Sequence, residues 1–347
     1  MGLLRHAPHL DSHSAALLAK HLYGLNAGAT LLTSERDQNF LLRTDAGEKF
    51  VLKIANALED RGLLEAQNAV MAHLGRDLSF CPQPVPTVAG ELISHIEDTS
   101  GSVPSTNARH FVRLITYLPG VPLGMKRDPS PALLRDLGKK LGQVDQALAD
   151  FDRDALHRNF HWDLANGTEI VRKYSSLIND AAMRATILRY VETFEQTTLP
   201  LLATLRRSII HNDANDYNVI VSDSTNEQVT GLIDFGDMVY SYTVGEVAVA
   251  IAYVILDKPD PLEAATHVVA GYDSKYKLKP EEIEVLFGLA LMRLCMSICL
   301  AADQQQQQPR NPYLMISQRA IAKTLPILIA RDLPNAAGAL RRACNCA

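Results

Sequence analysis

The chain has 347 residues, of which 47% are hydrophobic and 21% are charged, and its formal net charge is −5 at pH 7. This composition is typical of a soluble globular protein, and the length exceeds one ordinary core, so we expect two lobes. The negative charge argues against a protein that binds nucleic acid by neutralising phosphates. It mildly favours a cationic or zwitterionic small molecule as partner.

The first third of the chain is rich in β-type sequence. The predicted strands are residues 29–32, 39–43, 49–54, 91–98 and 109–120, the last of which ends in a Pro-Gly break. Between them, residues 61–74 predict a helix, because Leu63, Val70, Met71 and Leu74 recur at helical spacing.

From about residue 117 onward the pattern is mostly helical, and residues 131–148 predict a clear amphipathic helix. The run 247–256 is the strongest apolar segment that we identify, but it has only about half the length needed to cross a bilayer. We therefore expect a buried helix there, with no membrane span. Residues 304–308 are glutamines and predict a solvent loop between two C-terminal helices.

These elements predict an α+β fold of the bilobal, protein-kinase-like type. The β-rich N-lobe is expected at residues 1–116 with one helix, and the mainly helical C-lobe at residues 117–347. No apolar signal region opens the chain, so we expect a cytoplasmic protein. It would act as a monomer or homodimer, without nucleic-acid or membrane partners.

The cysteines suit a reducing compartment, because their number is odd and they form no disulfide framework. They are Cys81, Cys295, Cys299, Cys344 and Cys346. Cys295 and Cys299 share one helical face and are expected in the core, whereas Cys344 and Cys346 lie in a tail.

The chemistry of the chain is indicated by HNDANDYN followed by IDFGD, which place His211, Asp213, Asn218 and Asp234 in a fixed order. Phosphoryl transfer needs a carboxylate to align the attacking hydroxyl and oxygen ligands for magnesium. Asp213 can perform the first role, and Asn218 with Asp234 can perform the second.

The two metal-ligand candidates are expected to lie close together. The β-rich runs 217–222 and 229–235 flank a polar turn, which predicts a hairpin. The midpoint between Asn218 and Asp234 falls in that turn, so their side chains should lie nearly opposite each other at the open end. Mg²⁺ prefers such oxygen ligands together with phosphate oxygens.

In the β-rich lobe, Lys53 alternates with the apolar residues of FVLKI and points to the face opposite Leu52 and Ile54. Glu65 lies off the apolar stripe of the following helix and is expected to face the sheet. A Lys53–Glu65 pair would direct the ammonium toward nucleotide phosphates. The alternative is that both side chains are solvated surface residues.

The order VLKI, helical glutamate, YLPG, HNDANDYN and IDFGD resembles the aminoglycoside phosphotransferase superfamily of small-molecule kinases. Within it, HRNFHWDLAN and IDFGDMVYSYTVGEVAVAIAY resemble hydroxylysine kinases, which phosphorylate 5-hydroxylysine with GTP as the described donor. The resemblance implies a bilobal kinase that uses Mg²⁺ and ATP or GTP, with nucleotide between the lobes near Thr116, Tyr117 and Leu118. It assigns the base to Asp213, the metal ligands to Asn218 and Asp234, and phosphate binding to Lys53.

Two positions depart from the family pattern. The strand connection at residues 33–40 is TSERDQNF instead of a G-x-G-x-x-G loop, although its backbone amides can still cover phosphates. Residue 212 is asparagine where glycine is usual between the histidine and the aspartate.

Four further residues are singled out by the sequence. His211 is expected to brace the loop by hydrogen bonding. Asp237 points toward a substrate cation or caps a turn, and Glu246 stabilises a helix N-terminus. Trp162, the only tryptophan, either stacks on a substrate ammonium or packs in the core.

The acceptor best indicated is therefore 5-hydroxylysine, with choline, ethanolamine, homoserine or an aminoglycoside as alternatives. A protein kinase is disfavoured, because no Ala-Pro-Glu follows Asp-Phe-Gly. Outside the kinases, the alternative is a non-catalytic nucleotide- or metabolite-binding module, since a fold alone does not guarantee activity.

Overall fold

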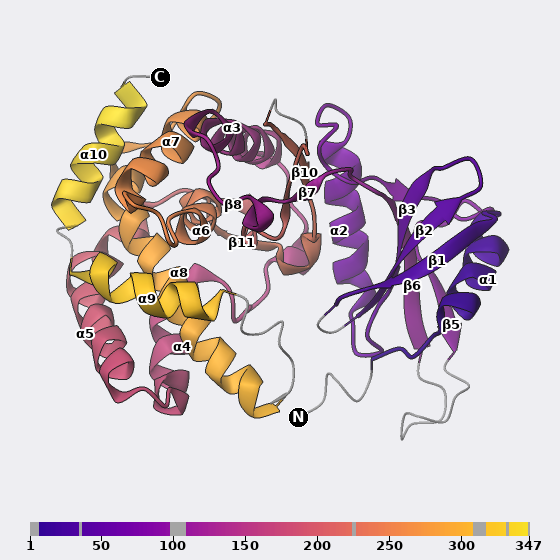
Figure 1. The fold of residues 1–347 in the computed structure, drawn as a ribbon, viewed down its shortest axis with the longest axis horizontal. Coiled ribbons are helices and arrows are strands. Elements are labelled where there is room, and N and C mark those ends of the chain that lie inside the picture. The colour runs from indigo at the N-terminus through magenta and orange to yellow at the C-terminus, as the bar shows by residue number, and fades with distance from the viewer. Residues whose placement is uncertain are drawn as a thin grey trace. The chain divides into compact units, whose positions relative to one another are not determined.

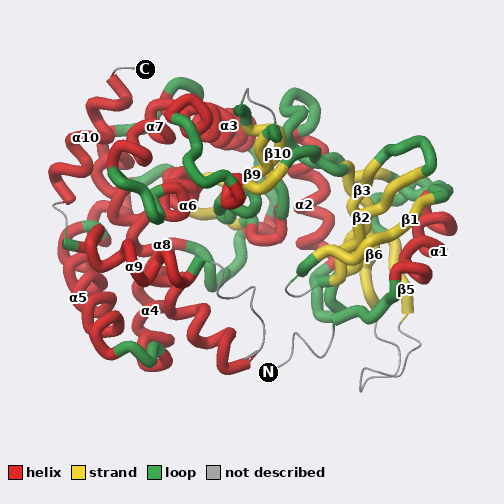
Figure 2. The backbone as a smooth tube through the Cα atoms, viewed as in Figure 1, coloured by secondary structure: helices red, strands yellow, loops and turns green. Residues whose placement is uncertain are grey.

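The computed structural model describes residues 7–34, 37–97, 109–223, 227–307, 317–330 and 333–345. The chain divides into two compact units, Met1–Leu118 and Pro119–Ala347. Strands dominate the first unit and helices the second (Figures 1 and 2). The boundary lies two residues beyond the predicted one.

The first unit is built on an antiparallel sheet in the order β1-β2-β3-β6-β4, with β5 paired to β6. The strands are β1 (Ala27–Leu32), β2 (Gln38–Thr44), β3 (Lys49–Ile54), β4 (Pro84–Val85), β5 (Ser94–Glu97) and β6 (Arg109–Thr116). All five predicted strands are confirmed, with β6 ending before the Pro-Gly break.

Two helices cover the sheet of the first unit, one on each face: α1 (Ser12–Tyr23) and α2 (Arg61–Leu74) (Figure 1). Helix α2 has the predicted bounds, and the side chain of Asp60 caps its first turn. The prediction of a single helix in this lobe was wrong. Helix α1 buries only Ala15, Ala19 and Tyr23, so its apolar stripe is narrow and gives a weak periodic signal.

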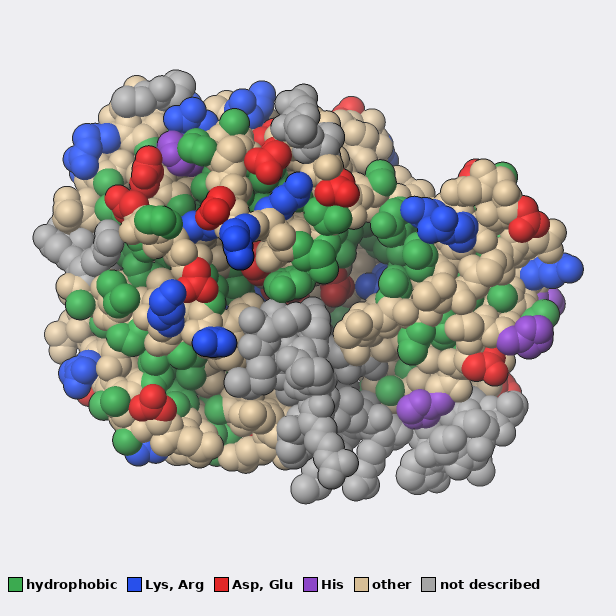
Figure 3. Space-filling model, viewed as in Figure 1, with side chains coloured by type: hydrophobic (Ala, Val, Ile, Leu, Met, Phe, Trp, Pro, Cys, Tyr) green, Lys and Arg blue, Asp and Glu red, His purple; other side chains and the backbone are tan. Residues whose placement is uncertain are grey.

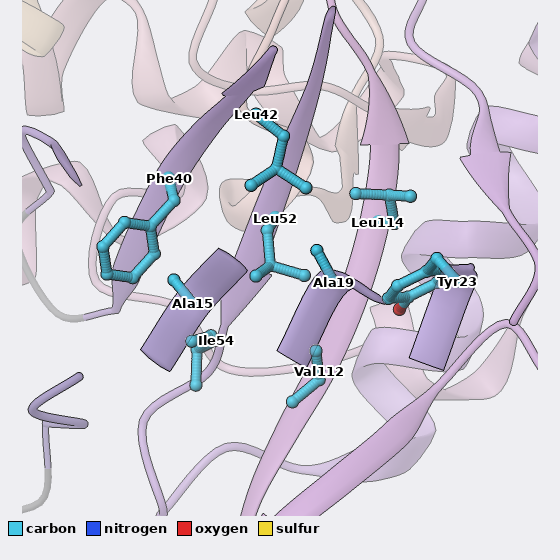
Figure 4. Packing of buried hydrophobic residues seen from close by; sticks show 9 residues of the cluster. All are labelled: Ala15, Ala19, Tyr23, Phe40, Leu42, Leu52, Ile54, Val112 and Leu114. Atoms are coloured by element: carbon cyan, nitrogen blue, oxygen red, sulfur yellow. The ribbon is translucent and has the colours of Figure 1, made fainter. Parts of the chain in front are cut away.

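The core of the first unit lies between α1 and the sheet. Figure 4 shows Leu52 and Ile54 of β3 gathered with Val112 and Leu114 of β6 next to the small side chains of Ala15 and Ala19 of α1. Side chains alternate along a strand, so Lys53 lies on the other face, as predicted.

The second unit is mainly helical, with two small sheets of order β10-β9-β7 and β11-β8. Its helices are α3 (Pro131–Leu148), α4 (Gly167–Tyr174), α5 (Ala181–Thr197), α6 (Val244–Val254), α7 (Pro261–Asp273), α8 (Pro280–Gln307), α9 (Gln318–Ile329) and α10 (Leu333–Asn345). Its strands are β7 (Val121–Pro122), β8 (Arg207–Ile210), β9 (Val219–Val221), β10 (Val229–Leu232) and β11 (Val239–Tyr242). Acidic and basic side chains are intermixed on the face shown in Figure 3.

Helix α8 is the longest apolar element. Its length and composition alone would allow it to cross a membrane, but 94% of its apolar window is buried inside the protein. The choice of 247–256 as the strongest apolar run was therefore wrong, although that run does form most of the buried helix α6. The glutamines at 304–307 also belong to α8 and not to a loop, because glutamine favours helix. Gln308 and residues 309–312 lie outside the described residues.

The cysteines of α8 are core residues, as predicted. Cys295 and Cys299 are both fully buried, and burial raises the pKa of the Cys299 thiol to about 12. Cys344 is half-buried, and Cys346 lies outside the part of the chain that the structure describes.

Helices α3 and α7 pack with their backbones in close contact, which requires glycine at the crossing. A Cβ on Gly138 would overlap the carbonyl oxygen of Val268, and a Cβ on Gly271 would overlap that of Arg135. Both obstacles are backbone atoms, so neither can move aside without separating the helices.

We predict that Gly271→Ala destabilises the protein by about 1–3 kcal/mol, because the overlap outweighs the roughly 1 kcal/mol that alanine contributes to helix propensity. Thermal unfolding measures the change. Gly338→Ala in α10 is the matched control, since its nearest neighbour is the flexible end of Arg342 at 3.5 Å. Equal effects at both positions would show that the crossing imposes no such constraint.

Candidate functional site

The motif residues lie on the loop between β8 and β9 and at the end of the β9–β10 hairpin. The predicted hairpin is confirmed, with Val219 opposite Leu232. The Ile233 amide donates to the carbonyl oxygen of Asn218 over 2.9 Å. Because Val219 pairs with Leu232, Asn218 lies opposite Ile233, one residue short of Asp234. The bulge between Val229 and Gly231 shifts the register by one residue, and without it Asn218 would lie opposite Leu232.

The carboxylate of Asp213 is the best-connected group of this loop. Its Oδ1 accepts from Asn215 Nδ2 at 3.1 Å, and its Oδ2 accepts from Asn218 Nδ2 at 2.6 Å. Asn218 Nδ2 also donates to the Asp213 carbonyl at 2.9 Å. These bonds fix the side-chain orientation of Asp213 from within its own loop.

A further donor to Asp213 comes from α8 and was missed by sequence reasoning. Arg293 Nη2 lies 2.9 Å from Asp213 Oδ1, and the arginine side chain is only 1% exposed. Arg293 also donates to the carbonyl of Trp162 at 2.8 Å. The available signal was a lone arginine in the apolar sequence LFGLALMRLCMSICL, since a buried charge needs a partner.

The environment of Asp213 opposes its ionisation. Its pKa is raised to about 8, first by burial and then by the neighbouring carboxylate of Asp237, whereas Arg293 lowers it. The arginine therefore keeps the carboxylate closer to its ionised form than burial alone would allow.

The unusual asparagine at position 212 has a conformational explanation. Asn212 has φ of 66°, in the left-handed region that glycine adopts freely and asparagine tolerates better than most residues. Its amide donates to Glu246 Oε2 at 3.0 Å, and its Nδ2 donates to the carbonyl of Asp237 at 3.2 Å. Glu246 is fully buried in the first turn of α6, so it anchors the loop in addition to its position at a helix N-terminus.

His211 braces the loop, as expected. Its Nε2 lies 3.0 Å from the carbonyl oxygen of Ile233, which can only accept, so Nε2 carries the proton. Its Nδ1 then accepts from the Asp213 amide at 3.3 Å. With both ring nitrogens in use, His211 ties the loop to the hairpin.

The Asp-Phe-Gly segment is held by a residue of the HRNF sequence. Arg158 donates to the carbonyls of Gly236 at 2.8 Å and Met238 at 3.0 Å. Asp234 precedes the short helix Phe235–Asp237 with φ of 62°. Asp234 and Asp237 both raise the pKa of Asp213, so the three carboxylates lie near one another.

The donor set fits a hard cation. Because Nδ2 of Asn218 faces Asp213, its oxygen Oδ1 is left for a metal, and Asp234 supplies a carboxylate on the neighbouring strand end. Among the described residues there is no cluster of three or more His, Cys, Asp or Glu side chains that could hold a metal alone. A magnesium site made with phosphate oxygens needs only one or two protein carboxylates.

In the first unit, one expected ion pair does not form. Glu65 is exposed and accepts from Arg61 Nε at 2.8 Å, so the expected Lys53–Glu65 pair was wrong. The sheet-facing position on α2 belongs to Asn68, which accepts from Arg113 at 3.2 Å. Arg113 is the cross-strand neighbour of Lys53, which is half-buried on β3.

The remaining candidates are placed as follows. Thr116 ends β6, and its hydroxyl oxygen accepts from the Gln83 amide at 2.9 Å. Tyr117 and Leu118 follow at the end of the first unit, where Lys49 Nζ lies 5.1 Å from the Tyr117 ring. In the second unit, Trp162 stacks on the guanidinium of Arg293 at 4.4 Å. Substrate contact by Trp162 and Asp237 stays a prediction.

Comparison with known proteins identifies the family. Residues 28–280 match the phosphotransferase enzyme family APH. The chain belongs to this family. Hydroxylysine kinase of Xenopus laevis is 33% identical to it over 345 residues, which cover 92% of this chain and 90% of that protein.

Solved structures of small-molecule kinases have the same fold. An amicoumacin kinase in complex with AMP-PNP, Ca²⁺ and amicoumacin aligns with a TM-score of 0.69 at 15% identity, covering 94% of this chain and 97% of that one. A microcompartment-associated aminopropanol kinase aligns with a TM-score of 0.69 at 17% identity, covering 94% and 99%. The predicted fold class and superfamily are thus confirmed, and the chain is a small-molecule kinase with a hydroxyl group as acceptor.

The role expected for Asp213 predicts that Arg293→Gln lowers kcat by roughly 10²-fold, because the carboxylate loses the donor that fixes its position. The acidic limb of the kcat/KM profile should also move to higher pH. Loss of the cation raises the Asp213 pKa, and activity requires the ionised form.

Two variants control this experiment. Arg293→Lys keeps the charge and should keep the limb near the wild-type pH, while Arg172→Gln removes an exposed arginine paired with Glu195 and should change neither quantity. An unmoved limb in Arg293→Gln would contradict electrostatic coupling to Asp213.

The conformation of residue 212 predicts different outcomes for two small substitutions. Asn212→Ala should destabilise the protein by about 1–2 kcal/mol, because alanine resists a positive φ. Asn212→Gly should remain within about 1 kcal/mol of wild type, since it loses only the hydrogen bond to Asp237. Thermal unfolding and kcat distinguish them. Equal losses would mean that the side-chain hydrogen bond matters more than φ.

Proposed function

We propose that this chain transfers the γ-phosphate of ATP or GTP to the side-chain hydroxyl of 5-hydroxylysine. The observation that carries the proposal is the likeness to hydroxylysine kinase, which extends over 92% of the chain at 33% identity. A likeness of this extent reaches well beyond the motif at residues 211–234, which supports a shared acceptor in addition to shared chemistry.

In the proposed reaction, Asp213 receives the hydrogen bond of the acceptor hydroxyl and takes its proton as the oxygen attacks the γ-phosphorus, while the bond to the β-phosphate oxygen breaks and the nucleoside diphosphate leaves. The bonds from Asn215, Asn218 and Arg293 hold the carboxylate in one orientation, so little reorganisation is needed during the reaction. Burial, and after it charge repulsion from Asp237, raises the pKa of Asp213 and so favours proton uptake.

Asn218 and Asp234 are proposed to hold Mg²⁺ through Oδ1 and the carboxylate. Bound magnesium neutralises charge on the transferred phosphate. Lys53 is proposed to bind nucleotide phosphate, with the backbone at residues 33–40 and 116–118 contributing to nucleotide binding. Residues 35 and 36 of the first of these segments lie outside the described residues.

We further propose that the enzyme is cytoplasmic and acts as a monomer or homodimer on a small molecule, without nucleic-acid or membrane partners. The location rests on the sequence alone.

We predict that Asp213→Asn lowers kcat by at least about 10³-fold with 5-hydroxylysine, because the amide cannot accept the proton. Purified enzyme with Mg²⁺ is tested with ATP and GTP in parallel against 5-hydroxylysine, homoserine, ethanolamine, choline and an aminoglycoside. Asp152→Asn, at an exposed aspartate paired with His157, is the control and should retain activity.

The panel separates the alternatives. Transfer to another acceptor but not to 5-hydroxylysine would refute the proposed substrate and leave the chemistry intact. Nucleotide binding without transfer to any acceptor would favour a non-catalytic module.

A further inference from the structure

The second unit contains a pocket of about 260 Å³ to which no role has been assigned above. It is formed by the turn after β7, the loop that carries Asp213, the end of α6 and the start of α9. Side chains of both charge signs line it, among them Arg127, Lys258 and Asp216. A mixed set of charges suits a ligand that itself carries both signs.

Asp216 is the group in this pocket that most needs a partner. Its Oδ1 is buried and has no hydrogen-bond partner among the described residues. Because Oδ1 is closed to solvent, a ligand ammonium group would bind at Oδ2 and would in that way reduce the cost of desolvating the carboxylate.

The backbone of the pocket leaves room for this carboxylate. A Cβ on Gly124 would lie 2.7 Å from Asp216 Oδ2 and 2.9 Å from Tyr217 Cε2. The Gly124 amide also donates to the carbonyl of Asp216 at 2.7 Å, which fixes the two segments against each other. Glycine at this position therefore permits a close approach that a larger residue would disturb.

The pocket adjoins the reaction centre. Its wall includes Tyr253, whose phenol is close enough to Arg293 to raise the pKa of the guanidinium against the effect of burial. Arg293 in turn contacts Asp213 at 2.9 Å. Asp216 follows Asp213 by three residues, a span of at most about 11 Å.

The positive side of the pocket can take a carboxylate. Arg127 is exposed, and its guanidinium has the fork geometry that binds carboxylates in a bidentate manner. Lys258 lies beside it, with Nζ 3.4 Å from the Arg127 carbonyl oxygen. An amino alcohol such as ethanolamine would leave these cations without a counterion, whereas an α-amino acid supplies one.

We propose that this pocket is the acceptor site and binds a zwitterionic amino acid, with the ammonium group on Asp216 and the carboxylate on Arg127. The inference rests on the proposed function. The cations Arg127 and Lys258 would make the acceptor site select amino acids over amino alcohols. The hydroxyl of the same molecule then reaches Asp213.

Calorimetric titration tests the pocket without relying on turnover. The protein, with Mg²⁺ and a non-hydrolysable ATP analogue, is titrated with 5-hydroxylysine and with the diamine that lacks its carboxylate. We expect wild type to prefer the amino acid. Asp216→Asn should weaken its binding about 10- to 100-fold, because a charged hydrogen bond is lost. Arg127→Gln should weaken it roughly fivefold and remove the preference over the diamine.

Asp128→Asn removes a neighbouring exposed carboxylate outside the pocket wall and should bind as wild type does. Gly124→Ala is a second test of the contact at Asp216, because its Cβ would displace that carboxylate, and it should also weaken the binding of 5-hydroxylysine. The inference is overturned if Asp216→Asn binds 5-hydroxylysine as tightly as wild type, or if wild type binds the diamine equally well.

Phosphoryl transfer separates the two proposals. Transfer to 5-hydroxylysine with unchanged binding in Asp216→Asn would refute the pocket and leave the proposed function standing. If Asp216→Asn weakens the binding of 5-hydroxylysine but wild type transfers no phosphate to it, the pocket stands and the proposed function is refuted. Neither binding nor transfer would refute both.

Discussion

The buried contact between Arg293 and Asp213 is the constraint on which the site depends. Arginine cannot lose its proton inside a protein, so a guanidinium that is 1% exposed must find an anion. The contact therefore works in two directions: the arginine needs the carboxylate for the stability of α8, and the carboxylate needs the arginine to remain ionised. Breaking such a pair by removing one partner typically costs about 3–5 kcal/mol. The position of the Asp213 carboxylate therefore depends on the packing of α8, the longest helix in the second unit.

The loop that carries Asp213 is anchored by elements that are distant in sequence. Helix α6 contributes Glu246, the β9–β10 hairpin contributes the carbonyl of Ile233, and the segment before α4 contributes Arg158. Glu246 accepts from the Asn212 amide, the Ile233 carbonyl accepts from the His211 ring, and Arg158 donates to the adjoining Asp-Phe-Gly segment, so the surroundings can hold Asn212 at a positive φ. Local strain of this kind persists where the surroundings determine the conformation from several sides.

Much of this arrangement can be predicted from sequence, because hydrophobic period and motif spacing are local signals. The bounds of α2 and α3 and the β9–β10 hairpin follow from such signals. The absence of a Lys53–Glu65 pair could not be predicted from such local signals. It depends on which turn of α2 faces the sheet, and Asn68 occupies that position. The role of Arg293 depends on a contact with a residue 80 positions away. Helix α1 was missed because small residues leave little periodic contrast, and α8 was overlooked in favour of the shorter α6.

Arg293 also matters before the chain has folded. Helix α8 is the one described helix with the length and composition of a membrane span, and Arg293 lies near its middle. An arginine at the centre of such a segment costs about 2.5–3.5 kcal/mol during insertion into a bilayer. The arginine therefore makes α8 a poorer membrane span than its length and apolar composition alone would suggest. The residue that orients the reactive carboxylate thus also makes a protein core the more favourable surrounding for this helix.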